Sequence, residues 1–209
     1  MSSLFRSVLT EYIGKITNED REILEKRIVK EEIRKVVFDE MKENVSPGCD
    51  GYSVIFYRHY WNEISDILVD LFNFIAKIGR MGIESRRSVI KLIPKIGKLL
   101  KLLENWRPIS LTNTDYKIYM KVLTNRIKPL LPKLIDYEQT AYVPGRSIFT
   151  SIRNTLDFER YLTETGQEGI LFNIDYRKCF DSVSRSFLYN IYLAHGFGEK
   201  FTKIQQTYT

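Results

Sequence analysis

One aspartate, Asp175, ends a short apolar run and is followed by a polar stretch. The run from Ile170 to Ile174 has the length of a buried β-strand, so Asp175 is expected at the carboxyl end of a strand. Because side chains alternate along a strand, Ile170, Phe172 and Ile174 would point into a core on the face opposite Asp175. A carboxylate in this position suits Mg²⁺, although turn formation or helix capping is a competing role.

The residues after Asp175 must turn the chain before a helix begins. Ser182 or Ser184 can cap that helix, and Gly196 is expected to end it. Its apolar positions recur every three or four residues and comprise Phe187, Leu188, Ile191 and His195.

A second chemically distinctive stretch is strongly basic. Between Arg86 and Arg107 there are seven cations and a single acid, Glu104, so this stretch carries the whole net charge of +6. Charge concentrated in this way indicates a polyanion or a triphosphate as ligand, although a lysine-rich loop is more often simply solvated.

Two short apolar segments enclose most of these cations. Val89 to Ile93 and Ile109 to Leu111 are predicted to pair as a β-hairpin with a long, mobile tip, because Pro94 and Gly97 interrupt the intervening loop.

Helices are predicted on both sides of this hairpin. Thr17 is expected to cap a first helix. Further apolar repeats predict a helix through Ile33, Val37 and Met41, a polar turn over residues 46–51, and a long amphipathic helix from Tyr57 that ends near Gly79. Beyond the hairpin, a helix through Tyr119, Leu123 and Ile127 is expected to end at Pro129 and Pro132, and another runs from Ile148 to Leu162.

Composition excludes several classes of protein. The 209 residues contain no apolar stretch long enough to cross a membrane and no apolar core of a signal peptide near Met1, which predicts an intracellular location without resolving nucleus from cytoplasm. Cys49 and Cys179 have neither zinc-site spacing nor a disulfide framework, so both are expected to be reduced.

The string from Asn173 to Val183 resembles the first palm motif of reverse transcriptases, especially those of non-LTR retrotransposons of the long interspersed element kind. The resemblance implies that Asp175 is the catalytic ligand of two Mg²⁺ ions, with Mn²⁺ as a possible substitute, and that Tyr176 also belongs to the metal site. It implies that Phe180 guards the 2′ position of the incoming sugar and that Asp181 is a structural carboxylate.

The resemblance extends to the hairpin, where residues 92–95 and 106–111 are similar to the fingers hairpin that closes over the incoming nucleotide. It implies that Arg107 grips the triphosphate, as a guanidinium fork can do. Lys91 and Lys95 are weaker candidates for the same role.

Residues 136–148 closely resemble the family segment that lies against the template. They imply nucleic-acid contacts by Gln139 and Arg146, although Arg146 also suits a turn after Pro-Gly. The turn at residues 46–51 resembles another family turn but departs from it at Val45 and Cys49, and no nucleic-acid role is transferred to it.

These motifs predict an α+β fold, the fingers subdomain of a right-hand, reverse transcriptase-like polymerase with an incomplete palm. Residues 1–16 would form a lead, 17–165 the fingers, and 166–209 the start of a palm that stops before the family's Asp-Asp motif, since the chain contains no Asp-Asp. The implied partners are an RNA template, a DNA primer and deoxynucleoside triphosphates, with no membrane; the oligomeric state is left open.

Three functions remain in view. The first is a fragment of an RNA-directed DNA polymerase that is inactive in isolation. The second is a nonenzymatic nucleic-acid-binding remnant of a retroelement, which the missing Asp-Asp favours. The third is a fragment of an RNA-templated RNA polymerase, against which the bulky Phe180 argues.

Overall fold

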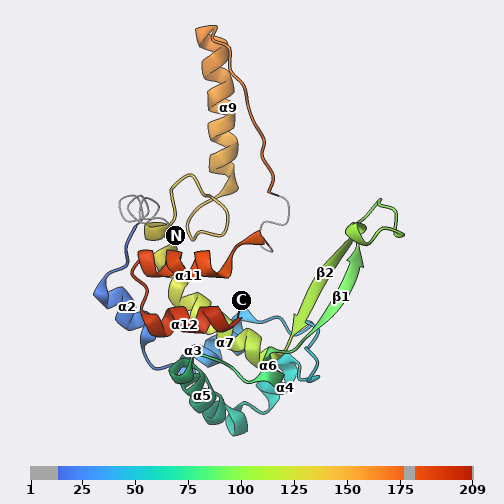
Figure 1. Ribbon diagram of the computed structural model, residues 1–209, viewed down its shortest axis with the longest axis vertical. Helices are drawn as coiled ribbons and strands as arrows, with labels where there is room; N and C mark the ends of the chain where they lie inside the picture. Colours follow the sequence, from blue (N-terminus) through green and yellow to red (C-terminus); the bar gives the residue numbers. More distant parts are fainter. Residues whose placement is uncertain (1–13, 177–181, 209) are drawn as a thin grey trace.

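The computed structural model describes residues 14–176 and 182–208, and it shows a helical body from which two elements project (Figure 1). One projection is an antiparallel β-hairpin. The other is a long helix, followed by an extended segment that runs back along it toward the body. The two projections carry most of the residues that the sequence marks as functional, so the body serves to hold them in place.

The body begins with α2 (Asn18–Glu25), α3 (Lys30–Lys35), the π-helical turn η1 (Val36–Glu40), α4 (Val54–His59), α5 (Trp61–Ile78) and α6 (Ile83–Arg86). The hairpin comprises β1 (Ser88–Pro94), η2 (Leu103–Asn105) and β2 (Trp106–Thr112). The chain continues through α7 (Thr114–Ile127), η3 (Lys128–Leu130), α8 (Leu131–Leu134), α9 (Ile148–Thr165), α11 (Arg185–Ala194) and α12 (Glu199–Tyr208).

Local capping chemistry determines where several helices begin and end. Thr17 Oγ1 accepts a hydrogen bond from Asp20 N at 3.1 Å and Asp20 Oδ2 accepts one from Thr17 N at 2.9 Å, a reciprocal capping box. Gly79 ends α5 in the left-handed conformation with φ +78°, and Ser184 caps α11. These boundaries confirm the predicted ones, except that the long helix predicted from Tyr57 is divided at Tyr60 into α4 and α5.

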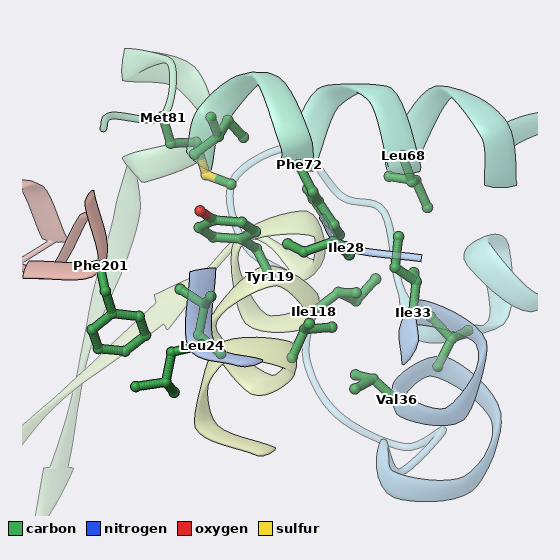
Figure 2. Packing of buried hydrophobic residues seen from close by; sticks show 14 of the residues in the cluster. Leu24, Ile28, Ile33, Val36, Leu68, Phe72, Met81, Ile118, Tyr119 and Phe201 are labelled. Atoms are coloured by element: carbon green, nitrogen blue, oxygen red, sulfur yellow. The ribbon is translucent and has the colours of Figure 1, made fainter. Parts of the chain in front are cut away.

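The hydrophobic core lies between α5, α7 and the N-terminal helices α2 and α3 (Figure 2). Phe72 of α5 packs against Tyr119 of α7, with ring centroids 5.1 Å apart. Phe201 of α12 is also buried, which ties the C-terminal helix to the same core. Other fully buried members are Leu24, Ile28, Ile33, Val36, Ile75, Ile118 and Val122. The apolar repeats predicted for the segments that form α3, α5 and α7 therefore meet in one cluster.

An ion pair joins α3 to α7 at the edge of this core. The Arg126 guanidinium donates to Glu32 Oε1 and Oε2, each at 2.7 Å, and its side chain is almost entirely buried. It also donates to the carbonyl oxygen of Leu24, in the last turn of α2, at 3.1 Å and to that of Arg27, past the end of α2, at 3.2 Å. Arg126 thus satisfies carbonyl groups that the helix end leaves without partners.

We expect Arg126→Ala to lower the free energy of unfolding by about 3 kcal/mol, because it leaves Glu32 half-buried without its counterion. Urea titration followed by circular dichroism measures this loss. Arg27→Ala is the matched control, since Arg27 forms only an exposed pair with Asp70 at 3.4 Å and should cost less than about 1 kcal/mol. Equal losses in the two variants would contradict a structural role for Arg126.

The Arg126–Glu32 ion pair makes the free energy of unfolding depend on pH in the acid range. Burial raises the pKa of Glu32, but hydrogen bonds from Arg126 and from the backbone N–H of Val29, with the charge of Arg126, outweigh it and leave the pKa below its ordinary value of 4.5. The stabilisation is therefore present above pH 4.5 and is lost as the pH falls through the lower folded-state pKa. Glu32→Gln should flatten this part of the acid-unfolding profile.

The strand predicted at 170–174 does not form. Residues 167–176 are irregular, and Ile170, Phe172 and Ile174 are 76%, 77% and 78% exposed instead of buried. A strand requires hydrogen-bonding neighbours, and within the described residues the sheet consists of β1 and β2 alone. The apolar pattern marks a segment suited to a sheet, but no described strand pairs with it.

The helix α9 is equally separate from the core. It begins at Ile148, as predicted, and continues to Thr165, three residues past the predicted end at Leu162, yet none of its residues is buried. In Figure 1 it stands away from the body, with the segment 167–176 running back beside it. The predicted palm residue Asp175 is therefore carried at the lower end of this extension.

Candidate nucleotide and nucleic-acid interface

The register of the hairpin places two candidate phosphate ligands on one face. Lys91 pairs with Ile109 and Ile93 pairs with Arg107. Residues opposite each other, and residues two apart along a strand, share a face of a sheet, so Lys91 and Arg107 lie on the same face. Both side chains are exposed and form no hydrogen bond or ion pair within residues 14–176 and 182–208. The predicted hairpin is confirmed, and this face presents two positive charges to solvent.

Lys95, the third cation predicted to bind nucleotide, is instead part of the hairpin's own framework. Its ammonium donates to the carbonyl oxygen of Glu104 at 2.7 Å, and its backbone N–H donates to the carbonyl oxygen of Asn105 at 2.8 Å. These bonds close the base of the tip loop that the sequence predicted to be mobile. A triphosphate would have to compete with the Glu104 carbonyl for this ammonium.

The base of the hairpin is clamped to the body by Asn113, which lies between β2 and α7. Its Oδ1 accepts from Cys49 Sγ and from Asp50 N, each at 3.4 Å, and its Nδ2 donates to the carbonyl oxygen of Glu84 at 3.1 Å. The side chain is buried and makes no hydrogen bond that caps α7. One amide thus joins the turn at 46–51, the helix α6 and the start of α7.

Two further bonds hold the same turn. Thr114 Oγ1 donates to the carbonyl oxygen of Tyr52 at 2.6 Å, and Lys117 Nζ donates to that of Ser46 at 3.1 Å. Burial lowers the pKa of Lys117. Burial likewise raises the pKa of Asp115 in the first turn of α7. The turn therefore orients the hairpin, a role that sequence reasoning missed because Asn113 stands where an ordinary helix cap is expected.

We expect Gly48→Ala to destabilise this clamp. A Cβ at Gly48 would lie 2.7 Å from Asn113 Cα, a backbone atom that cannot move aside easily. We therefore expect the free energy of unfolding to fall by about 1–3 kcal/mol. Hydrogen exchange should also speed up in β1 and β2. Gly82→Ala is the control, because a Cβ there meets nothing within 4 Å. Unchanged stability and exchange in Gly48→Ala would rule out close packing at this turn.

Arg146 organises the loop between α8 and α9. Its guanidinium donates to the carbonyl oxygens of Ile135 and Gln139, each at 2.8 Å, to that of Pro132 at 3.3 Å, and to that of Asp136. Four carbonyl oxygens therefore accept hydrogen bonds from the Arg146 guanidinium, which was predicted to contact the template. This supports the alternative role of Arg146, in which it stabilises the turn. Gln139 itself is exposed, and its side chain donates to the carbonyl oxygen of Ala141 at 3.3 Å.

Asp175 and Tyr176 are both exposed at the end of the extended segment. Phe180 and Asp181, the other two predicted palm residues, lie outside the described residues, as does Cys179. Within the described ranges no group of three His, Cys, Asp or Glu side chains is arranged to hold a metal ion. Asp175 alone does not make a site for two Mg²⁺ ions, which requires several oxygen ligands.

Comparison with known protein families identifies the class to which the chain belongs. Residues 93–209, more than half of the chain, match the family described as "Reverse transcriptase (RNA-dependent DNA polymerase)". The chain therefore belongs to the reverse transcriptase family. Its mixture of helices and a sheet is consistent with the α+β fold predicted for such a polymerase.

Among known proteins, the chain is similar to the "Transposon TX1 uncharacterized 149 kDa protein" of Xenopus laevis, with 34% identity over 167 residues. The matched region covers 80% of this chain but only 13% of that relative, so the chain spans a small part of the relative's length. The predicted resemblance to a retrotransposon reverse transcriptase is confirmed by these two findings. No helix in the described part of the chain is long and apolar enough to cross a membrane.

Proposed function

We propose that this chain forms the nucleotide- and template-binding part of an RNA-directed DNA polymerase encoded by a non-LTR retrotransposon. The observation that carries the proposal is the pair of exposed cations, Lys91 and Arg107, on one face of the hairpin in a chain of this family. Residues 17–165 are assigned to the fingers and 166–209 to the start of the palm. The substrates are an RNA template, a DNA primer and deoxynucleoside triphosphates inside the cell.

Arg107 is assigned to the triphosphate. A guanidinium keeps its charge and offers two parallel N–H groups to phosphate oxygens, whereas Lys91 adds a point charge on the same face. The Asn113 clamp supports this assignment, because a hairpin base that is already fixed reduces the backbone entropy that would be lost when both cations bind phosphate.

The loop from 136 to 146 is assigned to the template. Arg146 acts there by holding four carbonyl groups, so that the loop presents Gln139 in a defined place. In this proposal the contacts with the template come from Gln139 and the exposed backbone, and Arg146 contributes by organising them.

Asp175 and Tyr176 are assigned to the metal site of the longer polymerase, which would use Mg²⁺ or Mn²⁺. Two such ions would activate the primer 3′ oxygen and stabilise the leaving pyrophosphate. Phe180 is assigned to the exclusion of ribonucleotides and Asp181 to support of the palm. Since no group of three His, Cys, Asp or Glu side chains among the described residues is arranged to hold a metal ion, we assign the remaining ligands to other segments of the polymerase.

A nonenzymatic role in nucleic-acid binding is the second candidate for this chain in isolation. It is favoured by the segment at 170–174, which pairs with no strand among the described residues, and by the lack of a three-ligand metal cluster among the same residues. An RNA-templated RNA polymerase is less well supported, because the matched family is described as making DNA from RNA.

The first test uses the 209-residue chain itself. We expect it to bind RNA template–primer weakly, with affinity that falls steeply as salt is added, and to show no primer extension with Mg²⁺ or Mn²⁺. Replacing Lys91 and Arg107 together by glutamine should reduce the slope of log affinity against log salt by about 0.7–0.9 for each lost phosphate contact.

Three outcomes decide between the candidates. An unchanged salt slope in the double variant would remove the hairpin face from the interface. Absence of RNA binding even at low salt would reject the binding proposal as a whole. Primer extension that disappears in Asp175→Ala, a check against a contaminating polymerase, would show that the isolated chain is itself an enzyme.

A further inference from the structure

The tip of the hairpin, residues 96–103, presents apolar side chains to solvent. Ile96 is 99% exposed, Leu99 73% and Leu103 75%, and Leu100 and Leu102 are also about half or more exposed. The tip projects away from the helical body, so these side chains contribute nothing to the core (Figure 1). An exposed apolar cluster of this kind indicates a surface that is covered by a partner.

The tip nevertheless has a defined conformation. Trp106 Nε1 donates to the carbonyl oxygen of Leu100 and Asn105 Nδ2 donates to that of Leu99, each at 2.9 Å. Together with the two bonds from Lys95, these fasten the loop at both ends, and Gly97 makes the turn with φ +73°. The apolar side chains are therefore held in place before any partner binds.

Charge indicates what the partner is. Lys98 and Lys101 are interspersed among the apolar residues and are exposed, and their side chains form no hydrogen bond or ion pair within the described ranges. The single acid of the tip region is Glu104. This arrangement of apolar side chains and cations is complementary to a nucleic acid. Apolar side chains can insert between its stacked bases, and its phosphates attract the lysines.

We propose that the hairpin tip is a wedge that inserts between bases of a template–primer duplex, with Leu99 and Leu103 against the bases and Lys98 and Lys101 on neighbouring phosphates. This inference rests on the proposed nucleic-acid-binding function and assigns a part of it to the tip. It differs from the nucleotide site on the hairpin face, because the wedge contacts bases of the bound strands and requires no triphosphate.

The experiment uses the 209-residue chain and RNA–DNA template–primers in which 2-aminopurine is moved through the duplex one position at a time. Unstacking by the wedge should raise 2-aminopurine fluorescence at one or two adjacent positions. The double variant Leu99→Ser with Leu103→Ser should lose this signal and bind about tenfold more weakly, with the salt slope unchanged. Lys98→Gln with Lys101→Gln should keep the signal at saturating protein and reduce the salt slope.

Ile67→Ser is the matched control, because Ile67 is a similarly exposed apolar residue, 65%, on α5. Wild-type signal and affinity in the leucine double variant would overturn the wedge while leaving the binding function intact. Loss of chain self-association in that variant, without a change in RNA binding, would instead make the tip a protein contact and also overturn the proposal. No RNA binding by the wild-type chain would overturn both proposals.

Discussion

Asp175→Asn should abolish primer extension by a longer protein that includes the rest of the polymerase domain, while its affinity for template–primer changes little. The reason is that Asp175 is proposed to hold metal, and a neutral amide is a poor ligand for Mg²⁺. Removing a residue that only hydrogen-bonds a metal ligand typically lowers metal affinity or activity by about 10–100-fold. For loss of the ligand itself we therefore expect the extension rate to fall by more than about a hundredfold. Single-turnover extension beside a filter-binding assay separates the two effects.

The control for this variant is Asp157→Asn, which removes an exposed aspartate from α9. It should extend primers like the wild type. Extension by Asp175→Asn at more than a few per cent of the wild-type rate would exclude Asp175 as a catalytic ligand. A parallel loss of template–primer affinity would instead point to a structural role for the extended segment.

Arg107→Ala should raise the KM for deoxynucleoside triphosphates in the same longer protein by roughly 30- to 150-fold. This range corresponds to about 2–3 kcal/mol, the scale of hydrogen bonds to a charged group. Arg107→Lys should recover only part of the loss, because an ammonium cannot present the planar fork of a guanidinium. Steady-state kinetics at saturating template–primer measures the change.

Arg153→Ala, which removes an exposed cation from α9, is the control for nonspecific loss of charge and should leave the KM nearly unchanged. If Arg107→Ala weakens template–primer binding and leaves the KM for nucleotide unaltered, Arg107 contacts the nucleic-acid backbone and not the triphosphate. The face that it shares with Lys91 would then belong to the template site.

Local sequence was sufficient to predict most helices and the hairpin. Capping by Thr17 and Ser184, and termination by Gly79, depend on hydrogen bonds and φ angles within one helical turn. The apolar repeats that meet at Phe72 and Tyr119 were also visible, because one face of each helix must be apolar to be buried. The basic residues of the hairpin and the family motifs were equally readable from the chain.

The tertiary structure decided which of the cations predicted to bind nucleotide or nucleic acid have side chains that are free to contact a ligand. Arg146 and Lys95 are occupied by carbonyl groups, whereas Lys91 and Arg107 are brought to one face by the strand register. Neither outcome follows from residue type, because a cation's partners depend on segments that folding brings close.

Two further features depended on contacts distant in the sequence. Asn113 clamps a turn more than sixty residues earlier in the chain, and its position before a helix predicts only a local cap. The segment 170–174 has the composition of a strand but no described neighbour to pair with. Composition establishes that a segment suits a sheet, whereas strand formation also requires the backbone hydrogen bonds of a second strand, which only the assembled fold can supply.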